Sequence, residues 1–204
     1  MGPSQPNANR RPLKSRTTGW AGLAKRAVLA TGLNANQVSL AGIVIAALGA
    51  WALVETPARP LLLVAAAAAV QLRLLANMLD GLVAVEGGRG GPTGAIWNEF
   101  PDRIEDSLFL VAAGYAADFA WLGWLAALLA AVCAYVRLLG GSLGQPQDFG
   151  GPMAKPHRMA ALTIGCLVAV AWGEALPMAL AVIAAGTALT IALRLARLST
   201  ALRG

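Results

Sequence analysis

Six long runs of mainly apolar residues, five of them nearly free of charge, are the feature that most limits how this chain can fold. They cover residues 38–54, 60–79, 94–117, 119–139, 159–173 and 176–193. A helix needs roughly 20 residues to cross about 30 Å of hydrocarbon, and these runs are of that order, with the first and fifth the shortest. The third run is divided, being polar over 94–107 and apolar afterwards. The pattern predicts an all-α integral membrane protein with six transmembrane helices.

The distribution of charge predicts how these helices are oriented. Of the 204 residues, 57% are hydrophobic and 13% are charged, and the net charge is +6. Basic residues gather before the first run, in the 86–93 turn, in the 140–158 loop and at the C-terminus, whereas the connections near 55–59, 118 and 174 hold one, Arg59. Since basic loops stay in the cytoplasm, we expect both termini to be cytoplasmic, in a cell inner membrane. The basic residues flank the membrane segments and do not form a motif that reads a nucleic-acid groove, which argues against nucleic acid as a partner.

The first forty residues divide into two parts. Residues 1–16 are rich in Pro, Asn and Arg and are expected to form a disordered cytoplasmic tail. Residues 19–40 mix Trp20 and other apolar side chains with Lys25 and Arg26, a pattern that favours an amphipathic helix in the membrane interface. No apolar core with a cleavage site is evident, so no cleavable signal peptide is expected. Residues 17–204 are expected to form one membrane domain.

A polar stretch, NMLDGLVAVEGGRGGPTGAIWNEFPDRIED (residues 77–106), interrupts the apolar pattern. A Gly-rich turn divides it into the end of one helix and the start of the next. Spacings of three and four residues place its polar and small side chains on one face of each helix. These are Arg73, Asn77, Asp80 and Ala84 on the first helix, and Gly94, Asn98, Asp102 and Asp106 on the second. Because the helices form an antiparallel hairpin, the two faces are predicted to meet near the cytoplasmic surface.

Carboxylates that converge in a membrane require cations. An unpaired carboxylate near the bilayer centre costs at least about 2.5 kcal/mol, and carboxylates also repel one another. Oxygen ligands with amide neighbours favour Mg²⁺ or Mn²⁺, or Ca²⁺, over zinc. The simpler interpretation is solvation at the end of a hairpin, and Glu86, Glu105 and Asp106 taken singly suit it. The regular spacing favours a metal-binding site.

This spacing resembles the signature of the CDP-alcohol phosphotransferases, which is Asp-x2-Asp-Gly-x2-Ala-Arg, eight residues, then Gly-x3-Asp-x3-Asp. The chain reads Asn77-x2-Asp80-Gly81-x2-Ala84-Val85, eight residues, then Gly94-x3-Asn98-x3-Asp102. Six membrane segments behind an amphipathic helix are also similar to that family. The resemblance implies a membrane enzyme of phospholipid biosynthesis. Such an enzyme transfers a phosphoalcohol group from a CDP-linked donor, for example CDP-diacylglycerol, to an alcohol acceptor and releases CMP.

The resemblance also implies roles for the matched residues. It assigns Asp102 to deprotonating the acceptor hydroxyl. It assigns Mg²⁺ or Mn²⁺ binding to Asp80 and Asp102, together with Asn77 and Asn98. It leaves room for the donor at Gly81, Ala84 and Gly94. Family members often form homodimers, so a homodimer is expected here too.

The chain departs from the signature at three positions: the first and third aspartates are Asn77 and Asn98, and the arginine is Val85. Asn offers a neutral carbonyl oxygen where Asp offers a charge, so the motif brings two carboxylates to the metal rather than four. Asp106, one turn beyond Asp102, is the best placed substitute ligand, and Glu99 is a weaker one. Arg73 or Arg89 would take the place of the arginine. These departures leave open a degenerate family member that binds a CDP-lipid or another lipid without turnover.

A second set of basic residues lies in or beside the 140–158 loop. Arg137, Lys155 and Arg158, together with Arg73, are predicted to bind substrate phosphate. The alternative is that the loop residues are positive-inside charges that meet lipid headgroups. A small transporter or channel would also carry charge inside the membrane, but no inverted repeat is evident. The transferase is therefore our prediction.

Overall fold

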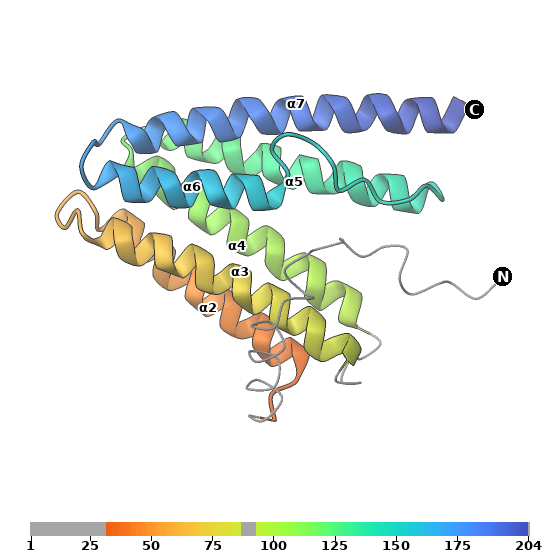
Figure 1. Ribbon diagram of the computed structural model, residues 1–204, viewed down its shortest axis with the longest axis horizontal. Helices are drawn as coiled ribbons and strands as arrows, with labels where there is room; N and C mark the ends of the chain where they lie inside the picture. The colour runs from red at the N-terminus through yellow and green to blue at the C-terminus, as the bar shows by residue number, and fades with distance from the viewer. Residues whose placement is uncertain (1–31, 87–92, 204) are drawn as a thin grey trace.

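The computed structural model describes residues 32–86 and 93–203, and these residues form α-helices and no strands. The helices are α2 (Ala35–Val54), α3 (Leu62–Glu86), α4 (Gly94–Ala116), α5 (Ala120–Ser142), α6 (Lys155–Ala169) and α7 (Ala175–Arg203). Each apolar run coincides with one helix, so the all-α prediction is confirmed. α2, α3 and α4 pack together on one side of the bundle, and α5, α6 and α7 on the other (Figure 1).

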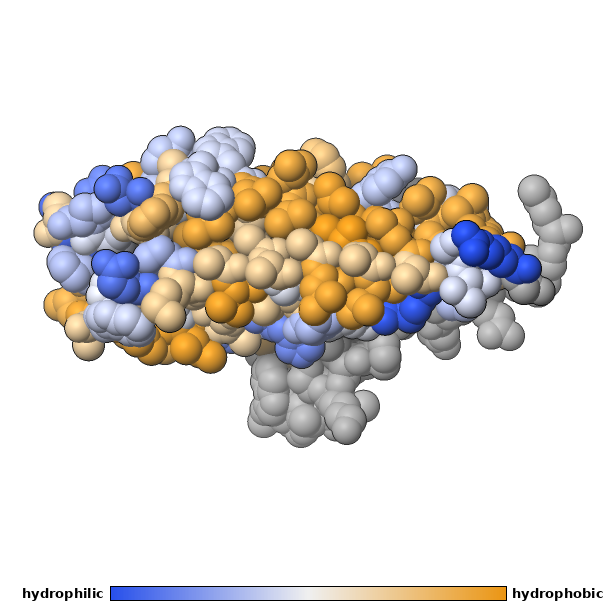
Figure 2. Space-filling view, turned by 90° about the horizontal axis from the view of Figure 1, so that it is seen from above, coloured by the Kyte–Doolittle hydropathy of each residue, from blue (hydrophilic) through white to orange (hydrophobic). Residues whose placement is uncertain are grey.

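Four of the helices, α2, α3, α5 and α7, are long and apolar enough to cross a membrane. α4 carries several charged side chains in its first half. α6 has 15 residues, which is about 22 Å of helix. Figure 2 shows an apolar band across one face of the bundle, with hydrophilic residues toward both ends. Large apolar side chains such as Leu48, Trp121 and Leu128 are more than half exposed, as expected where lipid is the solvent.

Consecutive helices run in alternating directions along the bundle. The α2–α3, α4–α5 and α6–α7 connections lie at one end, and the α5–α6 connection lies at the other with the C-terminal end of α7 (Figure 1). The described connections at the first end hold Glu55, Arg59, Asp118 and Glu174. The opposite end carries Lys155, Arg158, Arg197 and Arg203. The opposite end also carries Asp80, Asp102, Asp106 and Asp148, so most of its basic side chains are paired. The first end is weakly acidic, and the opposite end, which we call the basic end, holds every described arginine and lysine except Arg59.

The helices begin and end a few residues away from the predicted limits. α2 starts at Ala35, where Asn34 caps it: Asn34 Oδ1 accepts from Gln37 N at 2.9 Å, and Gln37 Oε1 accepts from Asn34 N at 2.9 Å. This reciprocal pair is a capping box. The last residues of the segment predicted as an interfacial helix therefore belong to α2. Residues 19–31 of that segment and the 1–16 tail lie outside the described residues.

Glycines allow the helices around the polar stretch to approach closely. A Cβ added to Gly114 of α4 would lie 2.7 Å from the Cα of Gly123 in α5. A Cβ added to Gly42 of α2 would lie 2.7 Å from Glu105 Oε1 in α4. Inside a membrane, helices associate mainly through such tight van der Waals contact. At Gly42 the backbone of α2 therefore lies directly against the charged first half of α4.

Candidate active site

The polar faces of α3 and α4 meet through Asn77 and Asp102. Asn77 Nδ2 donates a hydrogen bond to Asp102 Oδ1. Arg73, one turn earlier on α3, donates from the same guanidinium nitrogen to Asp102 Oδ1 and to the Asp102 backbone carbonyl, both at 3.2 Å. Three residues predicted to share one site are therefore in contact across the hairpin.

Arg73 is the centre of a buried ion-pair network. Its side chain has no exposed surface. Its Nε lies 2.5 Å from Glu105 Oε2, and its NH2 nitrogen lies 2.8 Å from Asp106 Oδ1. Arg158 of α6 closes the network, 3.5 Å from Asp106 Oδ2. The structure thus places Arg73 among carboxylates and not at a surface that substrate reaches, where the sequence placed it.

Glu105 is the principal difference from the sequence prediction. Solvation was the expected state for Glu105 and Asp106 taken singly, but their exposures are 0% and 3%. Asp106 lies on the predicted face, where Arg73 and Arg158 already engage both of its oxygens. Charge pairing explains why both carboxylates are tolerated inside the bundle.

Two further cations contact the Asp102 carboxylate. Lys155 Nζ, from the first turn of α6, forms an ion pair with Oδ1. Arg103 lies 3.3 Å from Oδ2. The Asp102 side chain remains 18% exposed, so it lies at the edge of the buried network. Among the predicted site residues it is therefore one that substrate can reach.

Asp80 lies deeper, beside α2. It is 6% exposed, and its Oδ2 accepts a hydrogen bond of 2.7 Å from Ser39 of α2. Its Oδ1 is buried without a hydrogen-bond partner among the described residues. Asp102 and Lys155 both lie close enough for their charges to interact with the Asp80 carboxylate. Ser39 lies outside the polar stretch, and nothing in the sequence distinguished it.

These residues suit a single hard cation. Proteins commonly hold Mg²⁺ through one or two carboxylates, with substrate phosphates and water completing the shell. Within residues 32–86 and 93–203, no three acidic, histidine or cysteine side chains converge as a complete protein-only metal site would require. Asp80, with its unpartnered Oδ1, and the part-exposed Asp102 are the two motif carboxylates that could hold one ion.

The glycines and small residues of the motif are only partly described. Gly81 is half-buried, and a Cβ added to Gly94 would meet no atom of the described residues within 4 Å. The side chains of Ala84, Val85 and Asn98, and all of Arg89, lie outside the described part of the structure.

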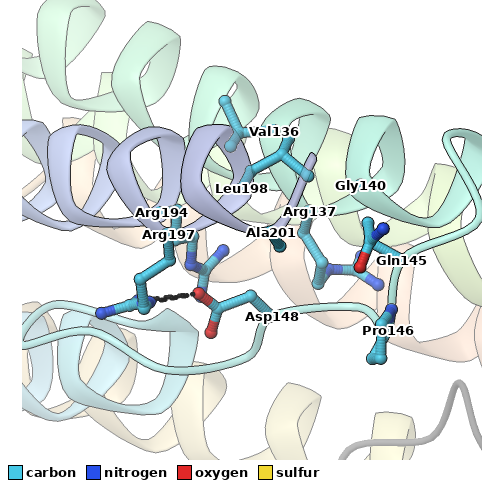
Figure 3. Close-up of a pocket in the computed structure, with 10 residues that line it drawn as sticks. All are labelled: Val136, Arg137, Gly140, Gln145, Pro146, Asp148, Arg194, Arg197, Leu198 and Ala201. Atoms are coloured by element: carbon cyan, nitrogen blue, oxygen red, sulfur yellow. Dashed lines mark hydrogen bonds and ion pairs between the residues drawn. The ribbon is translucent and has the colours of Figure 1, made fainter. Parts of the chain in front are cut away.

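A basic cavity of about 130 Å³ lies next to this hairpin, between α5, the α5–α6 loop and α7 (Figure 3). Arg137, Arg194 and Arg197 line it. Arg194 is buried and donates to the backbone carbonyls of Gly150 and Cys133, each at 2.9 Å. Arg197 lies 2.7 Å from Asp148. The sequence analysis selected Arg137 but took the two α7 arginines only as charges that flank a membrane segment.

Arg137 connects this cavity to the hairpin. Its guanidinium lies 2.5 Å from Glu99 of α4 and also donates to Gln147. The same group lies over the Phe149 ring, 5.1 Å from its centroid. Arg158, by contrast, turns toward Asp106 and the Met153 carbonyl. The predicted basic set therefore divides between the cavity (Arg137) and the hairpin (Lys155 and Arg158).

Comparison with known proteins gives one consistent result. No protein-family model matches the chain. A phosphatidylinositol phosphate synthase from Mycobacterium marinum (strain ATCC BAA-535 / M) is 30% identical over 181 residues, which cover 83% of this chain and 75% of that protein. The crystal structure of Mycobacterium tuberculosis phosphatidylinositol phosphate synthase (PgsA1) in complex with manganese and citrate superposes with a TM-score of 0.74 at 26% identity, covering 86% of this chain and 87% of that one. The structure of the same protein with CDP-DAG bound gives a TM-score of 0.73, also at 26% identity, over 85% and 90% of the two chains.

The similarity extends over most of the chain. Identity of 30% over three quarters of a relative, together with the shared helical fold, agrees with the motif spacing read from the sequence. On this evidence the chain is a member of the CDP-alcohol phosphotransferase family.

Proposed function

We infer that this protein is a membrane enzyme of phospholipid biosynthesis that transfers a phosphatidyl group from CDP-diacylglycerol to an alcohol and releases CMP. The observation that carries this inference is the contact between Asn77 and Asp102 across α3 and α4, beside the buried Asp80. These are motif positions of a family in which a similar structure has CDP-DAG bound. Mg²⁺ or Mn²⁺ is the cofactor, since a similar structure contains manganese, and the bound ion neutralises charge on the donor's pyrophosphate.

Asp102 is proposed as the general base. The acceptor hydroxyl oxygen attacks the phosphorus that carries the diacylglycerol, and its proton passes to the Asp102 carboxylate. The bond from that phosphorus to the oxygen shared with CMP breaks, and CMP leaves with the electron pair. Asp102 suits this role because it is the part-exposed carboxylate of the cluster. Asp80 and Asp102 hold the cation, with Asn77 and Asn98 as neutral oxygen donors and Asp106 as the predicted substitute ligand.

The acceptor is proposed to be a phosphorylated alcohol, with inositol phosphate first in order. The name of the relative implies this product, and the cavity lined by Arg137, Arg194 and Arg197 suits a phosphate group. Lys155 and Arg158, which contact Asp102 and Asp106 at the hairpin, remain predicted to bind substrate phosphate there. Arg137, which contacts both the loop and Glu99, would link the acceptor to the hairpin.

The arrangement in the membrane is part of the proposal. All six helices are taken to span the bilayer, with α4 tolerated because its charges are paired within the bundle. The basic end, which holds the active site and the C-terminus, is placed in the cytoplasm of an inner-membrane protein. A homodimer formed through membrane helices is proposed on the family resemblance.

The direct test is CMP release by the purified protein with CDP-diacylglycerol, Mn²⁺ or Mg²⁺, and a panel of inositol phosphate, glycerol phosphate, serine and inositol. We expect inositol phosphate to give the fastest turnover and a new phospholipid by mass spectrometry. Asp102→Asn should lower kcat by at least about 100-fold, because the base is lost. Asp118→Asn, the same change in an exposed turn at the opposite end, is the matched control and should retain full turnover.

A second candidate is a binder without turnover. It is favoured by the internal ion pairs that already surround Asp102. Binding of CDP-diacylglycerol by calorimetry without CMP release under either metal would establish that candidate and exclude the enzyme. Wild-type turnover by Asp102→Asn would instead exclude Asp102 as the base.

A further inference from the structure

Asp102 is surrounded by hydrogen-bond donors of its own chain. Its Oδ1 accepts from Arg73 at 3.2 Å and is also contacted by Asn77 Nδ2 and Lys155 Nζ. Its Oδ2 lies 3.3 Å from Arg103. A carboxylate oxygen has two lone pairs, so three donors fill the acceptor capacity of Oδ1. By this count a metal ion can bind this atom only if at least two of the three donors withdraw.

The charges around the hairpin are also balanced. Among the described residues the cluster contains four carboxylates and four cationic side chains. The carboxylates are Asp80, Asp102, Glu105 and Asp106, and the cations are Arg73, Arg103, Lys155 and Arg158. With the first and third motif aspartates replaced by Asn77 and Asn98, no excess negative charge remains to attract two divalent ions.

Among these four cations, Lys155 is the one best placed to neutralise Asp102 as a metal ion would. Arg73 is fully buried and is held by Glu105 at 2.5 Å, so it is fixed. The Lys155 side chain is 17% exposed, stands at the first residue of α6 and reaches the hairpin from another part of the chain. An ammonium group is a compact point charge on a flexible stem. It can neutralise Asp102 and still move when substrate enters.

We propose that this hairpin binds one divalent ion per chain and that the Lys155 ammonium takes the place of a second ion at Asp102. The proposal rests on the proposed function, because it concerns the cation set of the same site. Asn77 agrees with it: an amide can donate to the Asp102 carboxylate, as observed, where a second aspartate would repel it. The chain has thus exchanged two carboxylates and one external ion for two amides and one internal cation.

The test is the number and affinity of bound Mn²⁺ in the purified full-length protein, measured by the electron paramagnetic resonance signal of free Mn²⁺ without substrate. We expect one Mn²⁺ per wild-type chain. Lys155→Gln removes a positive charge that repels the ion, so it should bind Mn²⁺ at least about tenfold more tightly. Lys155→Arg keeps the charge and should bind with wild-type affinity. The triple variant Asn77→Asp, Asn98→Asp, Lys155→Gln should bind two.

Two Mn²⁺ ions on the wild-type chain, or none, would overturn the proposal. So would a Lys155→Gln variant that binds Mn²⁺ no more tightly than wild type. Size-exclusion chromatography will show whether Lys155→Gln folds. If it does not, the number of Mn²⁺ ions per wild-type chain and the Mn²⁺ affinity of Lys155→Arg still test the proposal. CMP release measured on the same preparation distinguishes a failure of the proposed function from a failure of this inference. One ion without CMP release refutes the function alone, and two ions with CMP release refute this inference alone.

Discussion

Arg73 is fully buried and contacts three carboxylates of α4, and this arrangement separates charge pairing from catalysis. Its guanidinium binds Glu105 and Asp106 most closely, and Asp102 at longer range. Removing one partner of a buried ion pair leaves an uncompensated charge, which is far costlier than removing both. The stability of this network can therefore be tested without reference to turnover.

We expect Arg73→Met to lower the free energy of unfolding by about 3–5 kcal/mol, because Glu105 is left buried and unpaired. Adding Glu105→Met should recover at least half of this loss, since Lys155 and Arg158 still serve Asp102 and Asp106. Denaturant unfolding in detergent measures both. Arg197→Met, which breaks the more exposed pair with Asp148, is the control and should change stability by at most about 1 kcal/mol. A double variant no more stable than the single one would contradict the pairing account.

At the scale of the elements, the crossing of α4 and α5 depends on Gly114 and Gly123. These two backbones lie so close that any side chain must push the helices apart. An alanine normally stabilises a helix relative to glycine. A loss of stability at this position would therefore report the helix contact and not the helix itself.

We expect Gly114→Ala to lower the free energy of unfolding by about 1–3 kcal/mol through overpacking. Gly173→Ala, in the turn before α7, is the control, because a Cβ there would meet no atom of the described residues within 4 Å. Thermal unfolding of the detergent-solubilised variants makes the comparison. If Gly114→Ala unfolds at the same temperature as Gly173→Ala, the close crossing is not important for stability.

The positions of the helices were predictable, because a run of apolar residues in a membrane protein has few alternatives to a helix. Helical spacing predicted one polar face on α3, with Arg73 and Asn77, and one on α4, with Asp102 and Asp106, and the antiparallel hairpin predicted that the two faces meet. The orientation of Glu105 did not, because spacing alone does not say which of two adjacent carboxylates faces a partner. One signal was present: Arg73 lies inside an apolar run, and such an arginine needs an acidic partner.

The Lys155 contact with Asp102 was beyond sequence reasoning for a different reason. The two residues come from α6 and α4, and no periodicity relates separate helices. The same holds for Ser39 of α2, which hydrogen-bonds Asp80. Only the packing of the bundle brings these side chains to the hairpin.

For the whole molecule, the positions of the basic residues predict the orientation in the membrane, with the basic end in the cytoplasm. Cys133 and Cys166 are 2% and 0% exposed and should be unreactive toward a membrane-impermeant maleimide. Ser142→Cys lies at the basic end and Asp118→Cys at the other, and both positions are exposed. In intact cells we expect labelling of Asp118→Cys alone, and in inverted vesicles labelling of Ser142→Cys alone. The reverse pattern would place the active site outside the cytoplasm.

Asp102, Glu105 and Asp106 each lie against a guanidinium or ammonium group supplied by the same polypeptide. Four aspartates without counterions would repel one another whenever magnesium was absent. Here side chains of the protein itself supply the positive charge. Removal of the metal should therefore stop the reaction while the protein stays folded, and activity should return when the metal is restored.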